Sequence, residues 1–294
     1  MATITLQYGK TQAKIETQRA EIVSFRGADG KERIWQADPA VWAKHAPVLF
    51  PIVCSIRDGR ILIDGEPYPM TKHGFARDME FTVAHTGEDF VDLVLTATEQ
   101  TKNMYPFDFA FHVTYRLFEN GYTTTFLIEN RSDRVMPCCV GGHPAYIVPM
   151  EDGAKYEDYQ VVFEKTEEGI TSLVPGGYLI EGEEQVKELQ DGRILPLNHD
   201  IFDTRDTLIF AGLNSRSVDL VHRENGHGMR FDFPKMEVLA IWSMPNKHAD
   251  YVCLEPWHGL PGRAQDSDNF EDKPYVTMLV PRKVYTTWFT MTLI

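Results

Sequence analysis

The chain contains 294 residues, 43% of them hydrophobic, and its 29 Lys and Arg are outnumbered by 43 Asp and Glu, which gives a formal net charge of −14. Such an acidic protein repels phosphate backbones and anionic lipid headgroups. Since the sequence holds no strong basic patch, we expect neither a nucleic acid nor a membrane surface as a partner. A chain of this length buries about three quarters of its unfolded surface, so its core needs no disulfide or metal.

The four cysteines, Cys54, Cys138, Cys139 and Cys253, form no Cys-x-x-Cys pair. They predict buried, reduced thiols rather than a disulfide framework or a set of zinc ligands. The first residues lack the apolar segment of a signal peptide, and no apolar run approaches the roughly 20 residues of a membrane span. We therefore expect a cytoplasmic protein.

Taken in chain order, short runs of alternating, β-branched or aromatic residues predict β-strands. They cover residues 21–25, 60–70 (strand, turn, strand), 90–97, 109–117, 122–129, 135–148, 217–222, 229–233 and 276–280. Several dipeptides between these runs tolerate the positive φ angles of tight hairpin turns. They are Asp29-Gly30, Asp58-Gly59, Asp64-Gly65, Asn120-Gly121 and Asn225-Gly226.

Two stretches have helical character, and both are short. Residues 38–45 open on an Asp-Pro pair suited to a helix start, whereas residues 181–190 are acidic and better explained as an exposed turn. Neither could cross over a parallel sheet repeatedly, and no linker or repeat divides the chain. The sequence therefore predicts an all-β fold of one domain, residues 1–294, with its strands in stacked antiparallel sheets.

The sequence contains no GxGxxG, GxxxxGK[ST], GxSxG or HExxH motif, so a common nucleotide-binding site and a zinc protease are excluded. Two histidines stand beside apolar strand sequence instead. His73 precedes Gly74, which lets the backbone turn while the imidazole projects outward, although a plain surface loop has the same pattern. His143 follows two glycines, and a histidine in such a strand is either hydrogen-bonded in the core or placed at a cleft.

Two carboxylates are candidates for chemistry. Glu255 closes the apolar segment 251–259, where a buried carboxylate needs a partner or acquires a raised pKa and becomes a useful base. Its neighbour Trp257 offers an apolar face to the C–H side of a sugar, or packs in the core. Asp206 precedes an apolar strand, where it either reaches into a cleft or caps its own turn.

Together, five segments resemble the aldose 1-epimerase (galactose mutarotase) superfamily, most closely its LacX-like branch. They are WQADPAVWAKHAPVLFPIV at 35–53, KHGFARDMEF at 72–81, GGHPAY at 141–146, RDTLIFAGLNSRSVDL at 205–220 and CLEPWHGLPG at 253–262. The resemblance implies a large antiparallel β-sandwich, the galactose mutarotase-like supersandwich, with the sugar site on its concave face. It also implies an isomerase that interconverts the α and β anomers of a free hexose such as galactose or glucose.

The same resemblance implies a role for each site residue. His143 is expected to be the general acid and Glu255 the general base. His73 is expected to hydrogen-bond the sugar and Asp206 to bind its hydroxyls. Arg77, in the same motif as His73, is a further candidate ligand.

One pair departs from the family pattern. Relatives usually carry Gly-Arg or Asn-Arg where this chain has Cys54-Ser55, so an arginine that contacts the sugar is missing. Arg57 lies two residues further on, on the same face of an extended strand, and is the candidate to replace it.

These residue types suit the opening of a cyclic hemiacetal, which needs a base for the anomeric hydroxyl proton and an acid for the ring oxygen. No cofactor or metal is expected. Glu and His have ordinary pKa values of about 4.3 and about 6.5. At a pH between these two values, the base is ionised and the acid is protonated. A carboxylate beside His143 should raise the pKa of that imidazole further. The expected partner is a small-molecule aldose, and a homodimer is compatible with the sequence.

Two other functions stay open at this point. A hexose-phosphate mutarotase would need cations such as Lys72, Arg77 and Arg57 around the phosphate, although the acidic net charge disfavours it. A non-catalytic sugar-binding protein is favoured by the departure at Ser55. Sugar binding would raise the melting temperature of such a protein, but the protein would accelerate no reaction.

Overall fold

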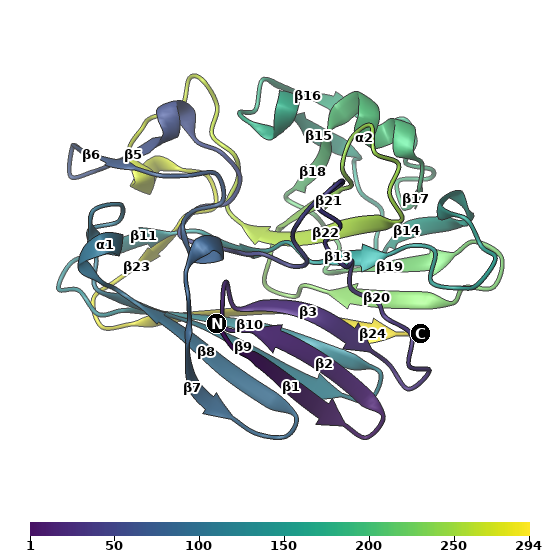
Figure 1. Ribbon diagram of the computed structural model, residues 1–294. Coiled ribbons are helices and arrows are strands. Elements are labelled where there is room, and N and C mark those ends of the chain that lie inside the picture. Colours follow the sequence, from purple (N-terminus) through teal and green to yellow (C-terminus); the bar gives the residue numbers. More distant parts are fainter.

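The computed structural model describes residues 1–294 and consists mainly of strands, all paired antiparallel with their neighbours. The largest sheet has nine strands (Figure 1). In spatial order they are β17 (Ile194–Pro196), β14 (Tyr159–Phe163), β19 (Ser217–His222), β20 (Gly228–Asp232), β24 (Val284–Leu293), β10 (Gly121–Asn130), β9 (Phe109–Phe118), β8 (Phe90–Thr96) and β7 (Thr82–Thr86).

A six-stranded sheet forms the opposing layer. Its strands are β18 (Thr207–Ala211), β21 (Val238–Trp242), β22 (Tyr251–His258), β12 (Val140–Gly142) and β4 (Val48–Leu49), with β13 (Ala145–Ile147) also paired to β22. A three-stranded sheet holds β1 (Thr3–Tyr8), β2 (Thr11–Glu16) and β3 (Glu21–Arg26).

The remaining elements are short. Three two-stranded sheets pair β5 (Arg60–Ile63) with β6 (Glu66–Pro69), β11 (Met136–Cys138) with β23 (Thr277–Leu279), and β15 (Ile170–Leu173) with β16 (Gly182–Gln185). The helices are α1 (Glu99–Lys102), α2 (His199–Arg205) and the single 3-10 turns Arg57–Gly59, Ala76–Asp78, Tyr156–Asp158, Pro175–Gly177 and Phe270–Asp272.

Packing of the sheets against one another follows from side-chain alternation. Along β10 the alternate residues Tyr122, Thr124, Phe126 and Ile128 are fully buried while Thr123, Thr125 and Leu127 between them are partly exposed, so one face of the sheet packs into the core. On that face the hydroxyl of Tyr122 lies 2.9 Å from the hydroxyl of Tyr146 on β13, which ties the two large sheets together. The β1–β3 sheet covers the same face, where the rings of Phe25 and Tyr122 pack 5.1 Å apart.

The expected antiparallel β-sandwich is therefore confirmed, and most predicted strands match observed ones within a few residues. The helix predicted over 38–45 is wrong. The carbonyl and carboxylate of Asp38 close a single turn by accepting the amides of Trp42 and Ala40, and the carboxylate of Glu21 then accepts the amides of His45 and Ala46. Those bonds fix the segment in an irregular path.

Two further segments differ from expectation. Residues 181–190 contribute the strand β16 before their turn, and the predicted strand over 135–148 is divided into β11, β12 and β13. The helix α2 was not predicted; it is capped by Asn198, whose side chain accepts the amide of Asp200. No helix in the structure has the length and apolar character needed to cross a membrane.

Candidate active site

A cleft of about 310 Å³ opens beside β22. Loops from distant parts of the chain meet there. The cleft is lined by six residues proposed from the sequence: His73, Arg77, His143, Asp206, Glu255 and Trp257. Glu255 and Trp257 come from β22, His143 from the break between β12 and β13, and Asp206 from the end of α2.

His143 and Glu255 form the buried centre of this cleft. Their Nε2 and Oε2 atoms lie 3.2 Å apart, and the side chains are 9% and 2% exposed. The two atoms do not form a hydrogen bond, and Oε2 of Glu255 has no other hydrogen-bond partner. Nδ1 of His143 and Nε1 of Trp257 are also buried without partners. A polar ligand could satisfy these atoms, since buried polar groups are normally hydrogen-bonded.

His73 is oriented by the backbone. Its Nδ1 accepts the amide proton of Cys54 at 3.0 Å, which places the proton of the neutral ring on Nε2. Burial, reinforced by the neighbouring His143, holds the pKa of His73 well below its usual value. This imidazole is therefore a neutral hydrogen-bond donor through Nε2.

Three residues at the cleft have positive φ angles, which side chains other than glycine rarely adopt. They are Cys54 (φ 52°), His73 (φ 66°) and Asp206 (φ 64°). Such conformations cost free energy and concentrate at functional sites. Three of the fourteen such residues in the chain thus lie at this cleft, on three separate segments.

Burial controls the proton affinities of the central pair. It raises the pKa of Glu255 well above its ordinary value of 4.5 and lowers the pKa of His143 well below 6.5. The expectation that the pKa of His143 is raised is therefore wrong for this cleft, because burial lowers it and the cations Arg77, Lys72 and Lys44 add to that effect. Both directions favour a protonated Glu255 beside a neutral His143.

This proton affinity predicts how stability depends on pH. Above about pH 4.5 the unfolded chain releases the Glu255 proton while the folded protein retains it, so wild-type stability falls as pH rises toward the folded pKa. Glu255→Gln removes that proton uptake. We expect the melting temperature of Glu255→Gln to exceed that of wild type by a margin that grows from about pH 5 to about pH 8. Thermal unfolding of both proteins across this range measures it, and a margin that shrinks with pH would contradict it.

Arg57 does not line the cleft, which corrects the prediction that it replaces the missing arginine. Its Nε and Nη2 donate to Oδ1 of Asp268 at 3.0 and 2.6 Å, and Nη1 donates to the carbonyl of Ala264. The residue begins a 3-10 turn, so the extended-strand spacing on which the prediction rested does not apply. Ser55 and Cys54 instead contact the carbonyl oxygen of Gly177 and hold a glycine loop beside the cleft.

Several cleft residues were not identified as site residues from the sequence. The ring of His143 stacks on Trp42 with centroids 5.0 Å apart, and Trp242 meets it edge-on at 5.5 Å. Lys44 also lines the cleft. Trp42 and Lys44 belong to the segment 35–53 that carries the family resemblance, which was the one available signal.

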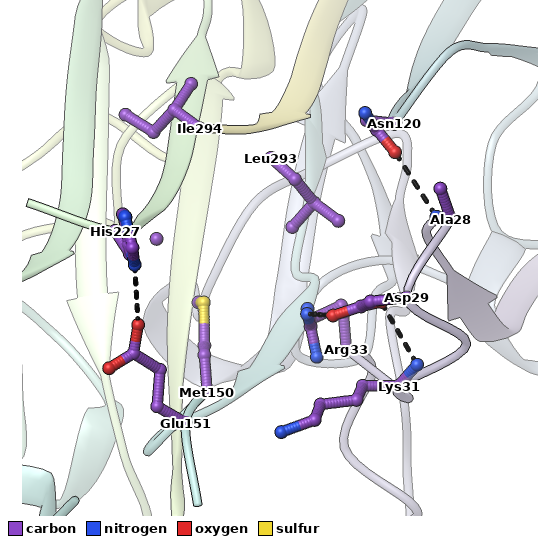
Figure 2. Close-up of a pocket in the computed structure, with 11 residues that line it drawn as sticks. Ala28, Asp29, Lys31, Arg33, Asn120, Met150, Glu151, His227, Leu293 and Ile294 are labelled. Atoms are coloured by element: carbon purple, nitrogen blue, oxygen red, sulfur yellow. Dashed lines mark hydrogen bonds and ion pairs between the residues drawn. The ribbon is translucent and has the colours of Figure 1, made fainter.

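A larger hollow of about 560 Å³ lies elsewhere, between the loop that follows β3 and the C-terminus (Figure 2). Its charged groups are largely paired with one another, as His227 is with Glu151 at 2.9 Å and Arg33 with Asp29. It contains none of the residues proposed from the sequence. The smaller cleft therefore carries the candidate chemistry.

One group of side chains could hold a metal ion. His143, Cys253 and Glu255 each place a ligand atom within 4.8 Å of the others, and all three are buried. Two of them are the buried pair described above, and burial raises the pKa of the Cys253 thiol well above its usual value, which disfavours the thiolate that a metal ion binds.

Comparisons with known proteins identify the family. A family model described as aldose 1-epimerase matches residues 2–270. The plasmid-encoded protein LacX of Lactococcus lactis subsp. lactis is 32% identical over 286 residues, 95% of each chain. A galactose mutarotase related enzyme from Lactobacillus acidophilus superposes with a TM-score of 0.91 at 29% identity, covering 100% of this chain and 97% of the other.

A galactose mutarotase-like protein from Lactobacillus casei ATCC 334 superposes with a TM-score of 0.92 at 27% identity over the full length of both chains. These matches extend across nearly the whole sequence, including every segment that lines the cleft. The chain belongs to the aldose 1-epimerase family.

Proposed function

We propose that the protein is a mutarotase that interconverts the α and β anomers of a hexose such as galactose or glucose. The observation that carries this proposal is the buried contact of 3.2 Å between His143 and Glu255, whose polar atoms lack other partners. Family membership implies a sugar ligand. His73, Asp206 and Trp257 line the same cleft and are the proposed sugar-binding groups, with Arg77 at its edge.

The proposed reaction begins when sugar hydroxyls supply hydrogen bonds to Glu255 and so favour its carboxylate. We propose that the bound sugar also aligns the two groups, whose Nε2 and Oε2 lie 3.2 Å apart, so that the proton passes to His143 and leaves an ionised base and a protonated acid. Glu255 then removes the anomeric hydroxyl proton while His143 protonates the ring oxygen, so the C1–O5 bond breaks and C1 becomes an aldehyde carbon. Rotation about C1–C2 and the reverse proton transfers close the ring on the other face.

The experiment that tests this proposal is polarimetry of freshly dissolved α-glucose and α-galactose. Purified protein should bring the optical rotation to equilibrium faster than buffer alone, in proportion to its concentration. A sugar-dependent rise in melting temperature with no acceleration for several aldoses would instead identify a non-catalytic sugar-binding protein.

Several expectations from the sequence stay predictions. They are the single domain spanning residues 1–294, the cytoplasmic location and the homodimer.

A further inference from the structure

One face of the His143 imidazole is covered by an indole. The ring of His143 stacks on that of Trp42 with centroids 5.0 Å apart and an angle of 25° between their planes. Trp242 meets the same imidazole almost at right angles, at 5.5 Å and 82°. The contact with Trp42 is therefore made through the face of its ring, where an aromatic group carries its negative charge.

The fold holds Trp42 in this place without a ligand. Its amide donates to the carbonyl of Asp38 at 2.8 Å, and its own carbonyl accepts Nε1 of Trp35 at 2.9 Å. Its ring also packs nearly parallel to that of Tyr251, at 5.9 Å and 12°. The indole is thus preorganised against His143 before any sugar binds.

The cleft otherwise disfavours a positive charge on His143. Burial lowers the pKa of this imidazole, and the cations Arg77, Lys72 and Lys44 lower it further. The proposed reaction nevertheless passes through a protonated His143. Some other group must therefore stabilise that state.

The titratable groups around the imidazole come from several elements. They are Glu255 and Cys253 on β22, Lys44 beside Trp42, Cys54, Lys72, His73 and Arg77 on segments that precede β7, and Asp206 after α2. Burial raises the pKa values of Glu255, Cys253 and Cys54 and lowers that of His73. These four groups are therefore neutral and supply no negative charge to the ring.

We propose that Trp42 is a positioning residue for the general acid: its indole fixes the plane of the His143 imidazole and stabilises that ring while it carries a proton. A cation within about 6 Å of an aromatic centroid is attracted to the ring face, most strongly by tryptophan. The attraction is larger where water is excluded, and the His143 side chain is only 9% exposed. This inference rests on the proposed mutarotase function and adds a residue to its machinery.

Trp42→Leu removes the aromatic face but keeps an apolar side chain in its place. We expect kcat for α-glucose or α-galactose to fall about fivefold while KM stays the same, because the indole acts on the acid and not on the sugar. Trp42→Phe, which keeps an aromatic face, should recover much of the loss. Trp288→Leu, which removes a tryptophan of β24 outside the cleft, should keep the wild-type kcat.

The pH profile of kcat separates this role from simple exclusion of water. In Trp42→Leu only the limb that reports His143 should move, and it should move to lower pH, because the protonated ring is less stable. A cleft opened to water would instead move the two limbs in opposite directions, since hydration raises the pKa of a buried histidine and lowers that of a buried glutamate. Opposite movement would overturn the proposal. A rise in KM with unchanged kcat would also overturn it, by assigning Trp42 to sugar binding.

A second measurement does not require the Trp42→Leu variant to fold. Replacing all five tryptophans by 5-fluorotryptophan keeps the shape of the rings and weakens the negative charge on their faces. It should lower kcat of the wild-type sequence by about twofold and leave kcat of Trp42→Phe unchanged. Equal effects on both proteins, or an unchanged kcat in a folded Trp42→Leu, would overturn the role of Trp42 alone. Wild-type exchange no faster than buffer would overturn the mutarotase proposal and this inference with it.

Discussion

Glu255→Gln is expected to reduce the rate of anomer interconversion by about 10²-fold or more, the contribution typical of a positioned general base. The amide cannot take the anomeric hydroxyl proton, nor can it pass a proton to His143 across the 3.2 Å contact. The side chains have nearly the same shape, so the fold should persist. Polarimetry with freshly dissolved α-glucose or α-galactose gives the rate. A thermal unfolding transition of the variant, measured as above, shows that it is folded.

Glu168→Gln is the matched control, because it removes an exposed carboxylate far from the cleft residues. It should retain the full wild-type rate. If Glu255→Gln were folded and as fast as wild type, Glu255 could not be the base, and the buried pair would lose its proposed role.

The proton distribution in the cleft bears on how the pair would catalyse the reaction. Burial favours a protonated Glu255 beside a neutral His143. These are also the protonation states that the proposed mechanism reaches once the ring has opened. In the proposed mechanism the neutral pair is thus both the resting state and the state reached on ring opening, and the bound sugar must first favour the carboxylate of Glu255.

Much of the fold could be predicted because the alternation of apolar and polar residues along a strand can be recognised within a few neighbouring residues. Residues 217–222 were predicted as a strand and form β19 with the same bounds. The segment 38–45 failed because its conformation depends on Glu21, a buried carboxylate 24 residues from His45. The helix α2 was missed because its signal is weak: a single Asn cap before seven residues.

The site could be predicted in part from short polar motifs within apolar sequence. The segments carrying His73, His143, Asp206 and Glu255 converge on one cleft, as the family resemblance implies. Arg57 failed because the argument assumed an extended strand, whereas the chain turns there and Asp268 binds the guanidinium. Lys44 was overlooked because no motif within the segment 35–53 distinguishes it from an ordinary surface lysine, although it lines the cleft.

Gly74→Ala should be the most damaging single substitution near the site. The residue has φ +73°, and a Cβ there would lie 2.1 Å from the carbonyl oxygen of Phe50, a backbone atom that cannot move aside. The positive φ alone costs about 1–2 kcal/mol, and the clash should bring the total to about 3–5 kcal/mol, a large share of the stability of a typical domain. Because Gly74 follows His73, mutarotase activity should fall in the same variant.

Gly30→Ala separates the two causes. Gly30 has φ +74°, almost the same value, but nothing lies within 4 Å of the position that a Cβ would take, so this variant should lose only the conformational part, about 1–2 kcal/mol. Denaturant unfolding of both variants and wild type gives the two free energies, provided the slopes agree. Equal losses would mean that backbone conformation alone accounts for the effect and that the β4 region yields to the added methyl. A larger loss for Gly74→Ala, together with lost activity, would tie the close approach of Gly74 and Phe50 to the placement of His73.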